Sequence, residues 1–144
     1  MKNLKIFLTL LSFMFVSTIF AAPQSVTGKW KTIDDETKKA KSIVEVYEQG
    51  GKVFGKIVEL LTPGDKGKTC TACTGGDKNK PIEGLVIIKN LKPDGDEYAG
   101  GTIMDPKNGK VYKCKMKRNG NKLEVRGFIG FSLMGRTQVW QKAD

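Results

Sequence analysis

Short runs of alternating apolar and polar residues, separated by turn-forming residues, make up most of the chain. The clearest run lies near residue 114, where Tyr112, Cys114 and Met116 alternate with Lys113 and Lys115. A period of two places the first set on one face of a strand and the lysines on the other. No segment after residue 22 has a convincing helical period. The pattern predicts an all-β fold whose strands have one buried and one solvent-exposed face.

Turn signals divide the chain into eight predicted strands. Asn119-Gly120 is a type I′ hairpin signal, and the segments 49–52 and 92–96 are further turns. Glycines inside strands mark bulges or bends; they are Gly55, Gly100, Gly101 and Gly127. The strands are expected at residues 26–33, 42–48, 53–61, 85–91, 97–104, 110–118, 122–129 and 135–142, with a long irregular stretch at 62–84.

Residues near the two ends of this array favour its closure into a barrel. Gly28-Lys29-Trp30 lies on the first predicted strand and Arg136 on the last. Glycine allows a close backbone approach, the indole plugs one opening, and a planar guanidinium can lie on the ring. A two-sheet sandwich would show similar strand spacing, and only the pairing of Trp30 with Arg136 favours the barrel. We therefore predict a single antiparallel, eight-stranded, up-and-down barrel, which is wide enough to hold one small ligand.

The N-terminal segment has the pattern of a cleaved signal peptide at residues 1–21. Lys2 and Lys5 precede an apolar stretch at 6–20, and Ala21-Ala22 supplies small residues for cleavage. A transmembrane anchor is the alternative, but the stretch is short and is interrupted by hydroxyl residues. We expect an exported protein, periplasmic or secreted, with one barrel domain at residues 22–144.

The sequence contains no histidine, which limits the kinds of catalytic site that the protein can form. This absence excludes Ser-His-Asp and Cys-His nucleophilic catalysis and nearly all catalytic zinc sites. The acidic run Asp34-Asp35-Glu36 falls in a predicted turn, where hydrated carboxylates do not acquire the split pKa values of an acid–base pair. We therefore expect no catalytic residue, no metal and no cofactor.

The chain is basic, with 25 Lys and Arg against 15 Asp and Glu, and the excess concentrates between residues 107 and 122. This basic stripe has two interpretations: a contact for an anionic membrane surface, lipopolysaccharide or an acidic ligand, or simply a solvated outer face. Nucleic acid is a poor candidate partner, because the chain has an export signal and few aromatic residues among its lysines.

Cys70-Thr71-Ala72-Cys73 lies in the long irregular stretch. Redox catalysis would require the first cysteine at a helix N-terminus, and Thr74-Gly75-Gly76 does not favour one. A metal site is not favoured, because the chain has no histidine and no second Cys-x-x-Cys motif. A structural disulfide formed after export is the favoured interpretation. Cys114 should be a buried thiol, although its pairing with Cys70 or Cys73 across the barrel mouth stays open.

The segment 128–134, Phe-Ile-Gly-Phe-Ser-Leu-Met, is apolar where a polar loop would be expected. It could cover one end of the barrel as part of the core, or form a lip for a hydrophobic ligand. We favour the core, because the segment adjoins the strand that carries Arg136.

Several blocks together resemble one bacterial family. They are Gly28-Lys29-Trp30-Lys31-Thr32, the segments 40–45, 55–58 and 81–85, Asp105-Pro106 with Gly109-Lys110, and 125–130 running into Gly135-Arg136-Thr137-Gln138 and Trp140. The chain is similar over essentially its whole length after residue 21 to the exported family called domain of unknown function 2147. The resemblance implies export and a lipocalin-like barrel, in which Trp30 and Arg136 match the pair that seals one end. It implies no activity.

These observations favour a non-catalytic, exported barrel that binds a small hydrophobic or amphiphilic ligand, such as a lipid, in its cup. The main alternative is a cell-envelope interaction protein that acts through the basic stripe, and the third is a thiol-redox protein that uses Cys70 and Cys73. The inward faces of the predicted strands supply the expected cavity residues: Val44, Val46, Ile57, Tyr98, Tyr112, Met116 and Val125.

Overall fold

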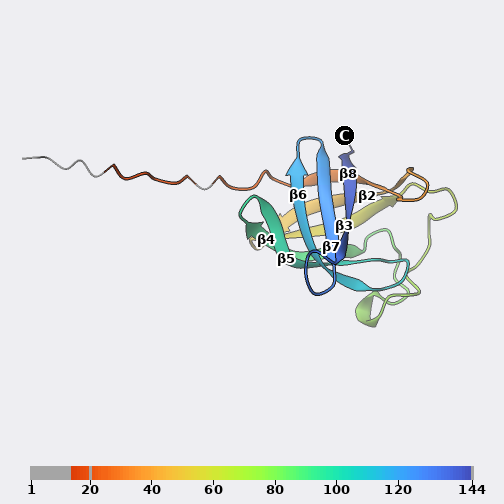
Figure 1. The fold of residues 1–144 in the computed structure, drawn as a ribbon. Coiled ribbons are helices and arrows are strands. Elements are labelled where there is room, and N and C mark those ends of the chain that lie inside the picture. Colours follow the sequence, from red (N-terminus) through yellow and green to blue (C-terminus); the bar gives the residue numbers. More distant parts are fainter. Residues whose placement is uncertain (1–13, 20, 144) are drawn as a thin grey trace, which may run out of the picture.

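Eight antiparallel strands in chain order form one closed barrel, with the last strand paired to the first (Figure 1). The structure is a computed structural model that describes residues 14–19 and 21–143. This architecture confirms the predicted eight-stranded, up-and-down barrel. The strands are β1 (Gly28–Ile33), β2 (Ala40–Gln49), β3 (Lys52–Leu60), β4 (Val86–Asp94), β5 (Glu97–Met104), β6 (Val111–Asn119), β7 (Lys122–Phe128) and β8 (Gly135–Lys142), and a short 3-10 helix, η1 (Gly75–Asp77), lies between β3 and β4.

The strand boundaries lie within two residues of those predicted, except at the end of β4. β4 continues through Pro93 to Asp94, so the turn before β5 is confined to Gly95 and Asp96. β7 ends at Phe128, which leaves Ile129 outside the strand. Proline does not interrupt β4, because Pro93 lies beyond Leu91, the last β4 residue that pairs with β3, at an edge position that tolerates a residue without an N–H group.

Strand pairing is irregular at two of the places where glycines predicted a bulge or bend. The register of β3 against β4 shifts on both sides of Gly55, and that of β5 against β6 shifts between Tyr98 and Gly101. Gly127 pairs with Cys114 in regular register, so no bulge forms there. The two shifts bend the neighbouring strands, as the closure of a small barrel requires.

The inward faces of the strands form one apolar core. The alternation in β6 is as predicted, since Cys114 and Met116 are buried and Lys113 and Lys117 are exposed. The largest fully buried side chains are Trp30, Trp140, Ile88, Leu91, Met116 and Leu123.

Trp30 closes one end of this core, which we call the closed end. Its indole is completely buried and donates a hydrogen bond from Nε1 to the carbonyl oxygen of Val26, at 2.9 Å. Trp30 pairs with Lys142 of β8 and so joins the first and last strands. Gly28 has a φ of 127°, and a Cβ there would lie 2.7 Å from Lys142 Nζ. The positive φ is the main reason for glycine at this position, since the lysine side chain is flexible at its end.

The prediction that Arg136 lies on Trp30 is wrong. The cations over the indole are Arg118 Cζ, 5.4 Å from the ring centroid, and Lys142 Nζ, at 5.2 Å. Arg136 pairs in register with Gly127, and its exposed guanidinium lies 3.2 Å from Asp35 Oδ2. The reason is the strand register: Trp30 lies opposite residue 142, and Arg136 lies six residues before it, about 20 Å along an extended strand.

Arg118 also holds the segment that precedes β1 against the closed end. Its Nη1 donates to the carbonyl oxygen of Ser25 at 2.9 Å, and its Nε donates to that of Gly120 at 2.8 Å. Val26, in the same segment, is fully buried. The closed end therefore consists of one aromatic plug, two cations and a strap of backbone.

The predicted signal peptide falls largely outside the described residues. Its described part, residues 14–19 and 21, forms no helix or strand, and Met14, Phe15 and Ile19 are exposed. Within the described parts of the chain, no helix has the length and apolar character needed to span a membrane.

Replacement of Arg118 by alanine should destabilise the barrel, because it removes a cation–π contact and two hydrogen bonds to backbone carbonyls. We expect Arg118→Ala to lower the free energy of unfolding by about 1–2 kcal/mol. Arg136→Ala removes only an exposed ion pair and should cost less than about 0.5 kcal/mol. Urea denaturation of both variants measures the difference. Equal stability of the two would contradict the assignment of Arg118 to the closed end.

Candidate functional site

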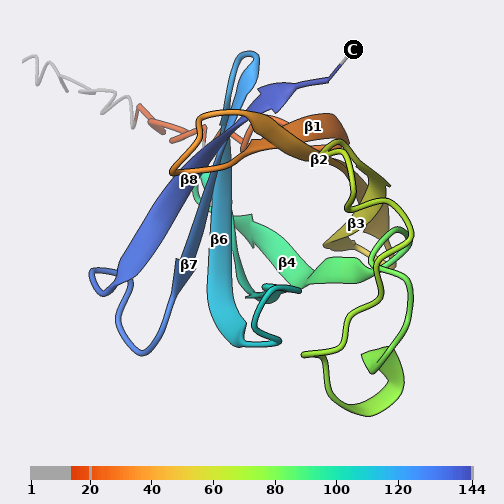
Figure 2. The ribbon, with the colours of Figure 1, turned by 90° about the vertical axis from the view of Figure 1, so that its right-hand side faces the viewer.

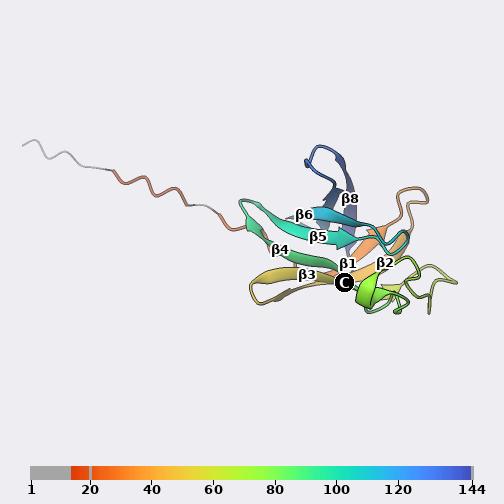
Figure 3. The same cartoon turned by 90° about the horizontal axis from the view of Figure 1, so that it is seen from below.

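Four connections lie at the opposite end of the barrel, which we call the open end. They are the segments 34–39, 61–85, 105–110 and 129–134. Figures 2 and 3 show the long connection with η1 (green) and the connection between β7 and β8 (dark blue) on different sides of this end. The open end therefore carries two separate features: a long loop beside β4 and an apolar loop beyond β7.

A disulfide between Cys70 and Cys73 holds the tip of the long loop, and its two Cα atoms are 5.3 Å apart. This confirms the favoured pairing and leaves Cys114 as the one free cysteine. Both disulfide cysteines are buried. The backbone N–H of Cys70 donates to Lys80, and its carbonyl oxygen accepts from Asn79, so the disulfide segment pairs with the chain that leads into β4.

The disulfide segment packs against the connection between β5 and β6. Cys70 Sγ lies 3.5 Å from the carbonyl oxygen of Pro106, and Cys73 Sγ lies 3.7 Å from Met104 Sδ. Gly109, with a φ of 71°, approaches so closely that a Cβ would overlap the carbonyl oxygen of Ala72. Glycine at 109 therefore allows the long loop to seat against the barrel wall.

Six of the seven expected cavity residues form packed core. Val44, Val46, Ile57, Tyr98, Met116 and Val125 are buried in one continuous cluster, and Tyr112 is half-buried next to Gly127. Burial raises the pKa of the Tyr98 hydroxyl. None of these seven residues lines either of the two pockets described below. The six buried side chains therefore fill the barrel interior at their positions, which corrects the prediction that they line a cavity.

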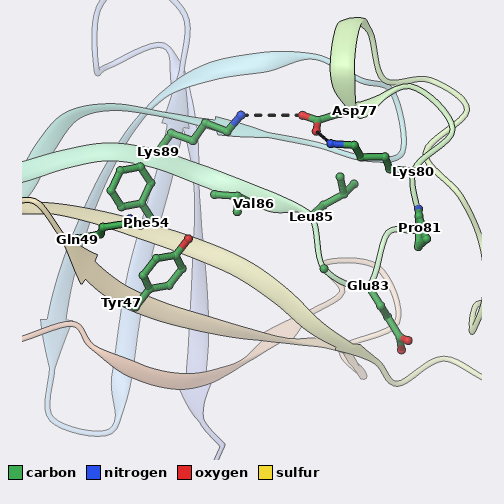
Figure 4. A pocket seen from close by; sticks show the side chains of 11 residues that line it. Tyr47, Gln49, Phe54, Asp77, Lys80, Pro81, Glu83, Leu85, Val86 and Lys89 are labelled. Atoms are coloured by element: carbon green, nitrogen blue, oxygen red, sulfur yellow. Dashed lines mark ion pairs between the residues drawn. The ribbon is translucent and has the colours of Figure 1, made fainter.

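The larger pocket, about 440 Å³, lies on the outside of the barrel wall, between β2–β4 and the long loop (Figure 4). Tyr47 of β2 and Phe54 of β3 are cross-strand partners whose rings stack, with centroids 5.8 Å apart. Val86 and Leu85 lie beside them, and Pro81 forms the far wall. The remaining lining residues are Gln49, Asp77, Lys80, Glu83, Gly84 and Lys89.

The rim of the larger pocket carries two ammonium groups around one carboxylate. Lys80 Nζ is 3.6 Å from Asp77 Oδ1, and Lys89 Nζ is 3.9 Å from Asp77 Oδ2. Figure 4 shows both lysines directed toward Asp77, with Glu83 directed away from them. The Glu83 carboxylate instead accepts a hydrogen bond from the backbone N–H of Leu60, at 2.9 Å. The rim near η1 therefore has an excess of positive charge.

A smaller pocket of about 130 Å³ adjoins the first. Asp77, Val86 and Lys89 line both pockets. Its other lining residues are Cys73, Thr74, Ile87, Thr102, Met104, Gly109 and Val111.

The apolar loop at 129–134 is exposed, so the prediction that it forms core at one barrel end is wrong. Phe131 and Leu133 are 80% and 91% exposed, and Ile129 and Met134 are also exposed. The physical reason is the position of the loop: the core residues of β7 and β8, Leu123, Val125 and Trp140, lie toward the closed end, and the loop extends beyond them.

Several cations of the basic stripe interact with other groups of the protein. Lys115 Nζ lies 3.3 Å from Glu97 Oε1, and Lys117 Nζ lies 2.6 Å from Asp96 Oδ2. The hydrogen bond and charge of Lys117 lower the pKa of the Asp96 carboxyl. Arg118, at the closed end, contacts Trp30 and Ser25. These three cations of the stripe therefore already have partners within the protein.

Residues 28–142 match the family described as "Uncharacterized protein conserved in bacteria (DUF2147)". The chain belongs to this family. The match begins and ends with the barrel itself, at the start of β1 and the end of β8. It confirms the resemblance seen in the sequence.

A solved structure shares the fold of this DUF2147 chain. It is described as "Protein HP1028 from the human pathogen Helicobacter pylori belongs to the lipocalin family", and it is 25% identical with a TM-score of 0.74. The similarity covers 83% of this chain and 84% of the other. Comparison with curated proteins gives no match. This DUF2147 barrel is therefore lipocalin-like, an architecture suited in general to the binding of small molecules.

The thiol of Cys114 should be unreactive in the folded protein, because burial raises its pKa from 9.0 to about 12. Ellman's reagent at about pH 8 should label no cysteine of the folded protein and one after denaturation without reductant. The neutral thiol is favoured in the folded state, so its contribution to stability is present below about pH 9 and is lost as the pH rises toward 12. Rapid labelling of the folded protein would contradict this burial.

Proposed function

We propose that this DUF2147 protein is an exported, non-catalytic barrel that binds a small amphiphilic molecule in the larger pocket. The apolar part of the ligand lies over Tyr47 and Phe54, and an anionic group lies near Lys80 and Lys89. The observation that carries the proposal is the pocket itself, in which a stacked aromatic pair and a cationic rim face the same space.

The size and lining of the pocket suit such a ligand. Small-molecule sites are concave, measure roughly 300–1,000 Å³, and combine apolar walls with a few polar groups. At about 440 Å³, with two aromatic rings and two aliphatic residues in its lining, this pocket falls within that range. It is open to solvent along the lysine side chains, which favours a molecule with one polar end.

The charge of the rim favours an anion at that polar end. An ammonium group has three donors, and the N–O distances of 3.6 and 3.9 Å to Asp77 exceed hydrogen-bond length. Both lysines therefore retain donors for a carboxylate, phosphate or sulfonate, and such charge-assisted bonds are the strong ones. Glu83 retains its negative charge, but its carboxylate is directed away from the two ammonium groups, toward the backbone N–H of Leu60.

The state of the cysteines supports a non-catalytic role. Cys70 and Cys73 form a buried disulfide, and η1 starts after Cys73 at Gly75, so no helix N-terminus acts on Cys70. Cys114 is buried among apolar side chains with a raised pKa. Thiol chemistry therefore has no exposed, activated sulfur among the described residues.

The proposal of export rests on the sequence pattern at residues 1–21 and on the disulfide. Disulfides persist in oxidising compartments, as outside the cytoplasm. Both features favour a periplasmic or secreted protein.

Neutralising the rim should weaken the binding of an anionic amphiphile. We use the fluorescent probe anilinonaphthalene sulfonate, which has an aromatic body and one negative charge. The double variant K80Q/K89Q should raise its Kd by roughly tenfold or more, because a hydrogen bond to a charged group contributes about 1.5–3 kcal/mol. Phe54→Ala should weaken binding to a similar degree through the loss of its aromatic surface. Fluorescence titration measures both.

The matched control is K107Q/K110Q, which removes the same charge from a different loop and should leave the Kd unchanged. F131S/L133S removes the other exposed apolar surface and should also leave this Kd unchanged. If K80Q/K89Q binds the probe as the wild-type protein does, the larger pocket is not the ligand site.

A further inference from the structure

The connection between β7 and β8 exposes four large apolar side chains within six residues. The exposed fractions are 68% for Ile129, 80% for Phe131, 91% for Leu133 and 74% for Met134. Scattered exposed apolar residues are ordinary, but a cluster of this kind marks an interaction surface. We call residues 129–134 the apolar tip.

The apolar tip is a defined turn. Arg126 Nε donates to the carbonyl oxygen of Ser132 at 2.6 Å, and its Nη1 donates to Thr137 Oγ1 at 2.9 Å. The backbone N–H of Met134 donates to the carbonyl oxygen of Phe131 at 3.0 Å. These bonds satisfy polar backbone groups of the turn, which lowers the cost of moving it into an apolar medium.

Cations surround the base of the apolar tip, and the tip itself has no acidic residue. Lys113 pairs in register with Phe128, the last residue of β7, and its side chain is exposed. Lys107 and Lys110 lie on the neighbouring connection at the open end and are also exposed. None of the three lysines forms an ion pair with another described residue, so their charge is available to an external anion.

The size and shape of the apolar tip favour a lipid surface over a protein partner. A stable protein interface buries about 1,000 Å² or more in total, which requires a broad complementary face. A six-residue turn at the end of a barrel does not offer such a face. A bilayer interface, by contrast, accepts a few apolar side chains to a depth of about 5–10 Å and attracts nearby lysines when its lipids are anionic.

We propose that the apolar tip inserts into the interfacial region of an anionic lipid bilayer, with Lys107, Lys110 and Lys113 at the headgroups. Phe131 and Leu133 are the anchors, since they are the most exposed of the four. This docking does not depend on the larger pocket, because η1 and the apolar tip lie on different sides of the open end (Figures 2 and 3).

The test is co-sedimentation of the full chain with vesicles of phosphatidylcholine mixed with phosphatidylglycerol. F131S/L133S should lower the partition coefficient by roughly tenfold or more, since two large apolar side chains no longer leave water. The matched control is Val139→Ser, which replaces an exposed apolar residue on the outer face of β8 and should leave partitioning unchanged. All variants carry the same N-terminal segment, so a difference between them arises from the substituted residues.

Two further experiments distinguish insertion of the tip into lipid from other causes of co-sedimentation. K107Q/K110Q/K113Q should reduce binding to these mixed vesicles several-fold and leave the weaker binding to phosphatidylcholine alone unchanged, because the charge acts on anionic headgroups. The fluorescence of Phe131→Trp should shift to shorter wavelength on addition of vesicles, since both natural tryptophans are already buried.

The proposal fails if F131S/L133S partitions like the wild-type protein, or if the emission of the Phe131→Trp variant does not shift on addition of vesicles. It also fails if sedimentation velocity shows that the wild-type chain self-associates through the tip and F131S/L133S abolishes that association without changing vesicle binding. Tyr47→Ala should leave vesicle binding intact, so a failure of the pocket proposal is distinguishable from a failure of this one.

Discussion

The barrel depends on the burial of Trp30 at its closed end. β1 and β8 pair over only two residue pairs, Trp30 with Lys142 and Lys31 with Gln141, whereas β7 and β8 pair over seven. The seam that closes the barrel is thus its shortest backbone ladder. The indole compensates, because it packs inside the core and is covered by Arg118 from β6 and Lys142 from β8. Side-chain packing, more than strand pairing, therefore joins the two ends of the sheet.

The order of the strands could be predicted from the sequence, because a period of two and turn residues are local signals. The residue that covers Trp30 could not. Closure is non-local, and its register decides which of two cations on β8 faces the indole; Lys142 does, and Arg136 points toward Asp35 at the open end. The family motif includes Arg136, but its position in a motif does not fix its distance from the plug.

The candidate site is harder to predict than the strand order, because its walls come from the solvent-exposed face of the sheet. Tyr47 and Phe54 alternate with the core residues, and periodicity alone assigns them to solvent. They become a pocket only when the loop at 61–85 folds back beside them, and the path of that irregular loop has no periodic signal. The exposure of the apolar tip differs from the prediction for a related reason. Apolar composition favours burial only where core lies within reach, and the core residues of β7 and β8 end at Val125, short of the tip.

The side chains shared by the two pockets have a consequence for the open end. Asp77, Val86 and Lys89 form one wall with a pocket on either side, and the smaller pocket reaches Cys73 and Gly109. Lys89 thus contributes to the binding properties of both spaces. A substitution of Lys89 therefore changes the lining of the space beside the aromatic pair and of the space beside the disulfide loop together.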